Sequence, residues 1–215
     1  VPRVVTAFAV GGLLAISGVL MQVLLRNPLA EPYILGSSGG AAVAALLAMS
    51  FGFSSFWIDT SAFSGSLIAT LLVFTIASGN GNWGPTRLLL TGVVLASGFS
   101  AITTLILALS SEQTVRGMLF WMMGDLSFAY YPMHLIYLLI VITFITSFLS
   151  RYFDILSRGE IQASILGIEV SFFRMMIFII TAVATSLSVT AVGVIGFVGL
   201  VVPHSVRLIV GSKHR

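Results

Sequence analysis

The chain has 215 residues, of which 58% are hydrophobic and only 8% are charged, and its mean hydropathy is +1.10. Soluble domains carry roughly 25% charged residues, so this composition excludes a water-soluble fold and favours an integral membrane protein. The net charge is +3, but the basic residues stand singly between apolar runs, which is typical of topology determinants and argues against nucleic-acid binding. Because there is no cysteine, disulfides and thiolate metal sites are excluded.

Apolar segments of transmembrane length follow one another along the chain and predict an all-α, polytopic transmembrane helical bundle of about seven spans. The segments are 4–25, 36–53, 61–78, 86–109, 132–150, 172–192 and 194–211. Polar or glycine-rich breaks separate them at 26–35, Asp59, 78–85, 110–132, 151–171 and near Gly193. No change of composition marks a second domain, so residues 1–215 are predicted to form a single transmembrane domain.

The first break contains two prolines, Pro28 and Pro32. Each lacks an N–H and disfavours helix in the residue before it, so no ordinary helix is expected through 27–32. Arg26 and Glu31 are costly in hydrocarbon, which places the break at a membrane face or in a cavity enclosed by protein.

Two glycines, Gly39 and Gly40, come directly after this break. Small residues let membrane helices approach closely, so plain helix packing explains them. Their position beside the break also makes them candidates for lining a substrate pathway, and both interpretations stay open.

The basic residues divide unevenly between alternate breaks. One set holds Arg26, Arg87, Arg151, Arg158, Arg174, Arg207, Lys213 and Arg215, and the other holds Arg3 and Arg116. By the positive-inside rule the first set is cytoplasmic, so the chain starts outside and ends inside. An outside start is unusual for a bacterial polytopic protein, so we expect a fragment that lacks at least one earlier helix. A seven-helix receptor is the alternative.

The cytoplasmic segment 151–171 is too polar to span a membrane. Ser157 with Glu160 three residues later is a capping-box pattern, and Gly167 is a stop signal, which together predict a short amphipathic helix over 157–168. Its expected apolar stripe is Ile161, Ile165 and Ile168. Such a helix either lies on lipid or binds a soluble partner.

The external segment 110–132 contains a short apolar run, 120–123, which is either an interfacial helix or an aromatic membrane anchor. Glu112 and Arg116 are four residues apart and could pair on one helix face. The three histidines show no metal-binding spacing, and the sequence contains no phosphate-binding loop, so this chain is not expected to hydrolyse ATP.

Four separated blocks of the sequence stand out: Gly18–Gln22 with Arg26–Pro32 and Leu35–Ala41; Thr86–Val93 with Phe120–Gly124; Gly159–Ala163 with Leu166–Gly167; and Gly193–His204 with Arg207, His214 and Arg215. Together these blocks resemble the FecCD-type permeases, the membrane subunits of bacterial ABC importers for ferric siderophores, haem and cobalamin. The resemblance implies a multi-pass protein of the bacterial cytoplasmic (inner) membrane with ten helices per subunit, of which this chain supplies helices two to eight.

The resemblance also implies partners and residue roles. The expected partners are a second identical or homologous permease, two cytoplasmic ATPase subunits and an extracytoplasmic substrate-binding protein, with no cofactor. Arg3 matches the position that docks the binding protein. The loops that close the pathway match Asn27, Leu29, Pro85 and Thr86, although the family often has Ser or Thr where Pro85 stands. The helices that seat in the ATPase match Ser157, Gly159, Glu160, Ile161, Ala163, Ile165 and Gly167.

A secondary transporter with broken helices at its substrate site is the alternative function. It would be expected to carry carboxylates or histidines for ion coupling inside its spans. The seven acidic residues of this chain fall at or near the predicted breaks instead, which favours the importer permease.

Overall fold

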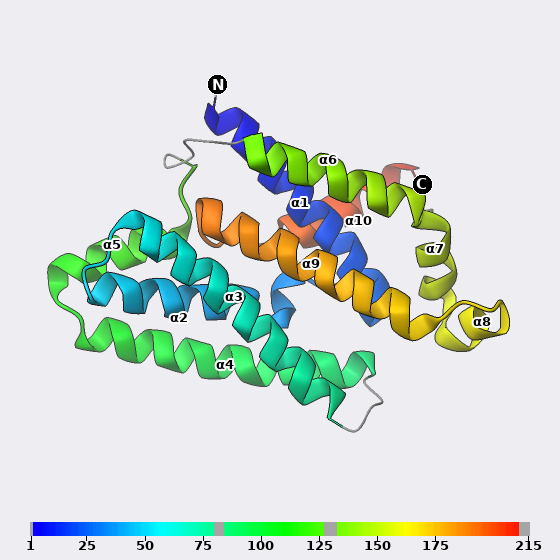
Figure 1. Cartoon of the computed structure of the whole chain (residues 1–215), viewed down its shortest axis with the longest axis horizontal. Coiled ribbons are helices and arrows are strands. Elements are labelled where there is room, and N and C mark those ends of the chain that lie inside the picture. The colour runs from blue at the N-terminus through cyan, green and yellow to red at the C-terminus, as the bar shows by residue number, and fades with distance from the viewer. Residues whose placement is uncertain (1, 80–83, 127–132, 211–215) are drawn as a thin grey trace. The chain divides into compact units, whose positions relative to one another are not determined.

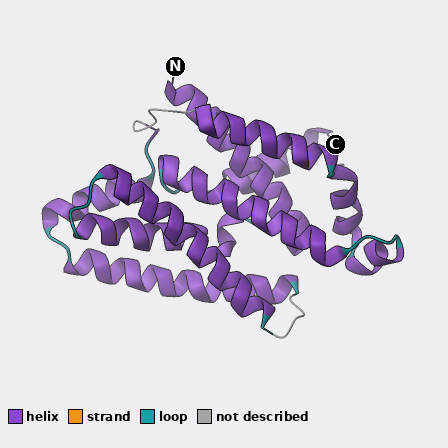
Figure 2. Ribbon diagram, in the orientation of Figure 1, coloured by secondary structure: helices purple, strands orange, loops and turns teal. Residues whose placement is uncertain are grey.

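The computed structural model describes residues 2–79, 84–126 and 133–210, and these residues form helices and connecting loops with no strand among them (Figures 1 and 2). The elements are α1 (Pro2–Leu25), the 3-10 turn η1 (Pro32–Leu35), α2 (Ser37–Ser50), α3 (Ser55–Ser78), α4 (Pro85–Leu109), α5 (Glu112–Met123), α6 (Met133–Phe148), α7 (Ser150–Arg158), α8 (Glu160–Ile165), α9 (Val170–Val192) and α10 (Val198–Val210). The all-α prediction is confirmed. Residues 80–83 of the predicted turn, and Lys213, His214 and Arg215, lie outside the described residues.

The predicted spans differ in length. Helices α1, α3, α4 and α9 have 23 to 25 residues, and about 1.5 Å of rise per residue makes each long enough for a hydrocarbon core about 30 Å thick. A fifth crossing is formed if α6 and α7, which meet at a bend of 61°, count as one span. Helices α2 and α10 have 14 and 13 residues, so they are shorter than the spans predicted at 36–53 and 194–211.

Glycine geometry explains why α2 is short. Gly52 has a φ of +71°, and the N–H groups of Gly52 and Phe53 donate to the carbonyls of Met49 and Ala48. This pattern ends the helix while the sequence is still apolar. Hydrophobicity alone therefore overestimated the length of this helix.

The predicted break at Asp59 is wrong. Helix α3 already begins at Ser55, with Ser54 at its N-cap, and the N–H groups of Trp57 and Ile58 donate to the Ser54 carbonyl. Asp59 is the fifth residue of α3 and is exposed, so the helix continues through it without a break.

The predicted helix over 157–168 is also corrected, because two helices occupy this region. Gly159, with a φ of +134°, separates α7 from α8 and takes the N-cap position of α8. Ser157 lies inside α7, and its hydroxyl donates to the Asp154 carbonyl at 2.8 Å, so the capping box does not form. Helix α8 stops where Gly167 turns with a φ of +77°, as predicted, which leaves Ile168 beyond the helix.

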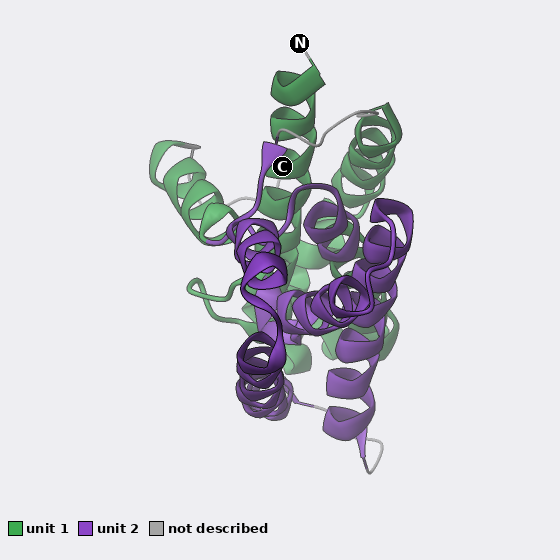
Figure 3. Ribbon diagram, turned by 90° about the vertical axis from the view of Figure 1, so that its left-hand side faces the viewer, with its two compact units in different colours: residues 1–32, 130–184, 197–215 green, residues 33–129, 185–196 purple. Residues whose placement is uncertain are grey.

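The chain divides into two compact units (Figure 3). The first comprises residues 1–32, 130–184 and 197–215, and the second comprises residues 33–129 and 185–196. In the first, α1 packs against α6, α7 and α10, and α8 packs against α7. In the second, α2 packs against α3, α4 and α5. A single transmembrane domain over 1–215 stays a prediction.

Helices approach backbone to backbone at glycines in both units. In the first unit, a methyl group on Gly18 of α1 would overlap the Gly199 carbonyl of α10. In the second, a methyl group on Gly40 of α2 would overlap the Gly65 carbonyl and the Ala69 side chain of α3. Such contacts are the usual means by which membrane helices pack without a hydrophobic driving force.

Candidate functional site

The polar break after α1 is a structured loop, and we call residues 26–31 the α1 loop. Helix α1 ends because Arg26 has a φ of +49° and the Arg26 and Asn27 N–H groups donate to the carbonyls of Val23 and Gln22. The Asn27 side-chain oxygen then accepts from the Leu29 N–H at 2.9 Å, which fixes a turn. The prediction that no α-helix passes through 27–32 is confirmed.

A three-residue ion cluster joins the α1 loop to α8 and α9 within the first unit. Oε1 of Glu160, the first residue of α8, accepts from Arg26 Nη2 at 2.6 Å and from Arg174 Nη1 at 3.2 Å. The Arg26 and Glu160 side chains are 39% and 36% exposed, whereas Arg174 is only 10% exposed. One carboxylate therefore connects a loop, a short helix and a long helix.

The α1 loop also contacts the start of α10. Oε1 of Glu31 accepts from the N–H of Phe197, the residue before α10, at 2.9 Å. A carboxylate at this position satisfies an N–H that the helix cannot pair and faces the positive end of the helix dipole. A second contact joins α10 to α1, because Arg207 of α10 donates to the side-chain oxygen of Gln22 on α1. The loop is thus attached to α8 through Arg26 and to α10 through Glu31.

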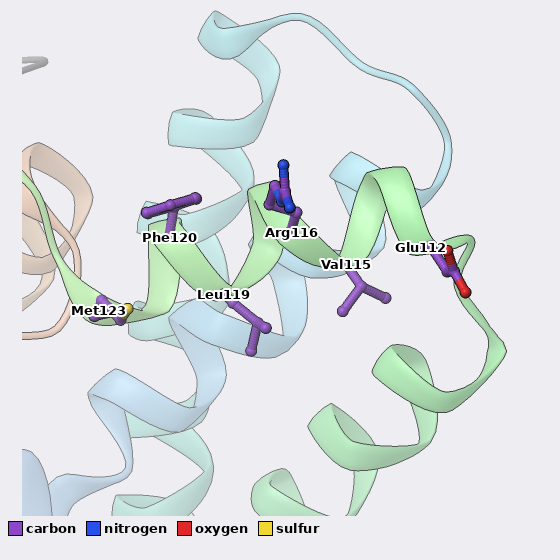
Figure 4. A pocket seen from close by; sticks show the side chains of 6 residues that line it. All are labelled: Glu112, Val115, Arg116, Leu119, Phe120 and Met123. Carbon is purple, nitrogen blue, oxygen red and sulfur yellow. The ribbon is translucent and has the colours of Figure 1, made fainter.

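In the second unit, the apolar run predicted at 120–123 belongs to the helix α5, which starts earlier. Ser111 caps this helix by accepting from the Thr114 N–H. One hollow of about 450 Å³ is lined by Glu112, Val115, Arg116, Leu119, Phe120 and Met123. Figure 4 shows Arg116 and Phe120 on one side of α5 and Val115 and Leu119 on the other. Among the described residues, no ion pair joins Glu112 to Arg116, although they are one turn apart.

Comparison with known proteins places the chain in a family. The sequence profile of the FecCD transport family matches residues 1–215. The chain belongs to the FecCD transport family. It is 37% identical to the cobalamin import system permease protein of Halobacterium salinarum and 37% identical to the hemin transport system permease protein of Yersinia pestis, over its whole length in both cases. It spans 58% and 66% of the length of these two relatives.

A solved structure agrees with this membership. The chain is similar to an inward-facing conformation of a metal-chelate type ABC transporter, with a TM-score of 0.91 and 32% identity. The similarity covers 99% of this chain and 69% of the solved one. The FecCD-type fold and the family resemblance seen in the sequence are both confirmed, and the long apolar helices agree with a permease of the inner membrane.

The residues that the resemblance assigns to pathway loops fall in different units of this FecCD chain. Asn27 and the 68%-exposed Leu29 lie in the α1 loop of the first unit. Pro85 and Thr86 open α4 in the second unit, where proline at the first helical position is well tolerated. The gate role of all four residues stays a prediction.

The two glycines after the break are in contact with neighbouring helices. A methyl group on Gly39 would lie 2.9 Å from the Phe99 Cβ on α4, and Gly40 faces α3 as described above. These contacts are explained by helix packing. A pathway role for Gly39 and Gly40 stays a prediction.

Most residues assigned to ATPase coupling lie on or beside α8. Ile161 and Ile165 are 77% and 78% exposed, whereas Ala163 between them is fully buried. Helix α8 therefore packs through Ala163 and presents two isoleucines away from its unit. Arg3, assigned to docking of the binding protein, is exposed in the first turn of α1.

Sequence reasoning did not find the contacts that hold these segments together. Glu160 was assigned to a helix cap, and its bonds to Arg26 and Arg174 were not predicted. The bonds of Glu31 to Phe197 and of Gln22 to Arg207 were missed as well. The sequence did contain one signal, because this chain has few charged residues and several of them stand beside the breaks. That signal indicates which residues matter but does not show which of them bond to each other.

Proposed function

We propose that the full-length protein is the transmembrane permease subunit of a binding-protein-dependent ABC importer for an iron chelate, either a ferric siderophore or haem, or for cobalamin. The observation that supports this most strongly is the match of the whole chain to the FecCD family together with the TM-score of 0.91 to a metal-chelate type transporter. The two relatives named for different substrates are equally similar to this chain, so sequence identity does not choose between the substrates.

The proposed machine contains two permease subunits, identical or homologous, two soluble ATPase subunits and an extracytoplasmic binding protein. ATP binding would draw the ATPase subunits together, and this movement would tilt the membrane helices so that a cavity between the permeases opens on alternate sides. No bond of the substrate is made or broken. We therefore assign this chain no catalytic residue.

Helix α8 is the proposed contact with the ATPase. Its exposed Ile161 and Ile165 are suited to fill an apolar groove on a partner. A helix that lies on lipid is usually rich in Lys and Arg on its polar face, but α8 offers Glu160, Gln162 and Ser164. This composition favours a protein partner over an anionic membrane surface.

The proposed orientation places residue 3 outside and α7 and α8 in the cytoplasm. It is supported by the eight-to-two division of the basic residues. In this orientation Arg3 is available to a carboxylate of the binding protein.

Uptake by the full-length transporter tests the proposed function. The permease would be reconstituted in proteoliposomes together with its binding protein and with the ATPase encoded by a neighbouring gene. ATP would be supplied on the side of the membrane that carries the ATPase. Radiolabelled cyanocobalamin, hemin and a ferric hydroxamate siderophore would be offered separately. We expect ATP-dependent accumulation of one of them, and none with an ATPase variant that cannot hydrolyse ATP. Failure of all three to accumulate would contradict the proposal.

A further inference from the structure

We propose that Glu160 is a positioning residue that transmits movement of α8 to the α1 loop, through its bond to Arg26, and to α9, through its bond to Arg174. This inference rests on the proposed function, because it requires that α8 contacts the ATPase. It gives Glu160 a role inside the permease, distinct from the contact with the ATPase that Ile161 and Ile165 make.

The geometry of α8 is that of a small unit attached at few points. The helix has six residues and lies between Gly159 and Gly167, whose φ angles of +134° and +77° favour glycine. A methyl group on either glycine would meet no atom within 4 Å, so both turns have free space around them. Among the described residues, Glu160 is the only α8 side chain that bonds to the α1 loop or to α9.

The charges of the cluster make this attachment specific. Glu160 Oε1 lies between two guanidinium groups, which would repel each other if the carboxylate were neutralised. The Arg26–Glu160 pair is partly exposed, and such a pair alone contributes little to stability. Arg174 is 90% buried, and a buried charge is sensitive to the loss of a counter-charge. Neutralising Glu160 would therefore weaken the attachment of α8 to the α1 loop and to α9, although α8 stays packed through Ala163, and would let Arg26 move away from the buried arginine.

The α1 loop continues the connection beyond α8. Arg26 is fixed at the end of α1 by the two backbone bonds described above, so a shift of its side chain acts on a structured turn. Five residues later, Glu31 holds the N–H of Phe197 at the start of α10. A displacement of the loop would then reach α10 as well as the exposed Leu29, which the family resemblance assigns to the pathway.

A spin label on Leu29→Cys in the complete reconstituted transporter tests the inference. Residues 1–215 contain no cysteine, so the label is unique within them, and any cysteine elsewhere in the complete transporter is first replaced by serine. The mobility of the label is recorded by electron paramagnetic resonance without nucleotide and with ATP plus vanadate. Four permeases are compared: the labelled parent, Glu160→Gln, Arg26→Gln and the double variant Arg26→Gln/Glu160→Gln. Glu169→Gln is the matched control. It removes a carboxylate that is exposed, lies in the same segment and forms no ion pair with any described residue.

We expect the nucleotide-dependent change at residue 29 in the parent and in Glu169→Gln, and its loss in Glu160→Gln. The number of substrate molecules transported per ATP should fall about tenfold in Glu160→Gln, the size expected for loss of a charge-assisted hydrogen bond. The double variant should be no worse than Glu160→Gln alone, because Arg26 acts through its bond to Glu160, whereas Glu160 also bonds to Arg174. Glu160→Asp, which keeps the charge, should restore part of the response.

Co-purification of the ATPase separates this inference from the proposed function. Glu160 belongs to the segment that the resemblance assigns to the ATPase, but its carboxylate bonds to Arg26 and Arg174, so we expect Glu160→Gln to retain the ATPase through the exposed Ile161 and Ile165. An unchanged response at residue 29 in Glu160→Gln, additive losses in the double variant, or release of the ATPase by Glu160→Gln would each overturn the inference and leave the importer assignment standing. Retention of the ATPase and of coupled transport by Ile161→Asp/Ile165→Asp would instead overturn the role of α8 itself.

Discussion

The contact between α2 and α3 and the attachment of α8 are built in opposite ways. Helices α2 and α3 meet at Gly40 and Gly65, around a core of small side chains that includes Ala41, Ala45 and Ala62. Helix α8 instead buries Ala163 and is tied to the α1 loop and α9 by one carboxylate. Close packing resists displacement because any shift creates overlap or a void, whereas a short helix between two glycine turns can move as a unit. The difference indicates a rigid helix pair in one unit and a movable contact element in the other.

The largest expected effect comes from removing the apolar contact surface of α8. In Ile161→Asp/Ile165→Asp, co-purification of the ATPase with the complete permease should fall by more than about tenfold, because each buried anchor at an interface commonly contributes about 2 kcal/mol. Ser164→Asp, which adds a charge at an exposed position of the same helix, should retain the ATPase. Equal loss in both variants would show that added charge, and not the isoleucines, matters.

The next largest effect is expected on stability and tests the close contact between α2 and α3. Gly40→Ala should lower the stability of the permease by about 2–3 kcal/mol, because the added methyl group overlaps the Gly65 carbonyl and the Ala69 side chain. Gly98→Ala is the matched control, since Gly98 is exposed in α4 and a methyl group there meets no atom within 4 Å. It should be neutral or slightly stabilising. Thermal unfolding in detergent compares the two, and equal melting temperatures would contradict the close contact.

A smaller effect is expected on the association rate of the binding protein, for which Arg3 is the proposed docking residue. Arg3→Glu should slow association of the binding protein by up to about tenfold at low salt, with little change in permease abundance, because exposed charges act mainly on encounter rates. Arg116→Glu makes the same change of charge on α5 and should have a weaker effect. Surface plasmon resonance on permease in nanodiscs measures both, and equal slowing would assign the effect to net charge and not to docking.

The smallest expected effect is a change in stability at Phe197, whose N–H donates to Glu31. Phe197 has a φ of +68°, which is unfavourable for a side chain with a Cβ, and it is 70% exposed. Phe197→Gly keeps the N–H and relieves the strain, so it should raise stability by about 0.5 kcal/mol after the entropy cost of glycine. Phe51→Gly is the comparison, since Phe51 is 74% exposed with a φ of −85° and has no strain to relieve. A lower melting temperature for Phe197→Gly than for Phe51→Gly would contradict this expectation.

Local chemistry explains which parts of the fold could be predicted from the sequence. The loop around Pro28 and Pro32 and the stop at Gly167 follow from backbone constraints that act within a few residues. The cap at Ser157 could not be decided in this way, because a serine hydroxyl bonds as readily to a carbonyl three residues earlier, as it does here to Asp154.

The candidate site required information that a single sequence does not hold. Arg26 and Glu160 are 134 residues apart, and Glu31 and Phe197 are 166 residues apart. No periodicity or short motif links residues at these separations. The family resemblance assigns the α8 region to a contact with the ATPase, which stays a proposal, and the bond from Glu160 to the α1 loop is seen only when the helices are placed in space.

Hydrogen exchange of the complete transporter, with and without ATP plus vanadate, tests most directly whether α8 and the α1 loop move together while α2 and α3 stay fixed. We expect nucleotide to change exchange at the backbone amides of residues 26–31 and 160–167 in parallel, with no change in α2 and α3 around Gly40 and Gly65. Glu160→Gln should abolish the change at 26–31 and keep the change at 160–167. Equal changes in all four segments, or a response of the α1 loop that persists in Glu160→Gln, would contradict the division into a rigid helix pair and a movable contact element.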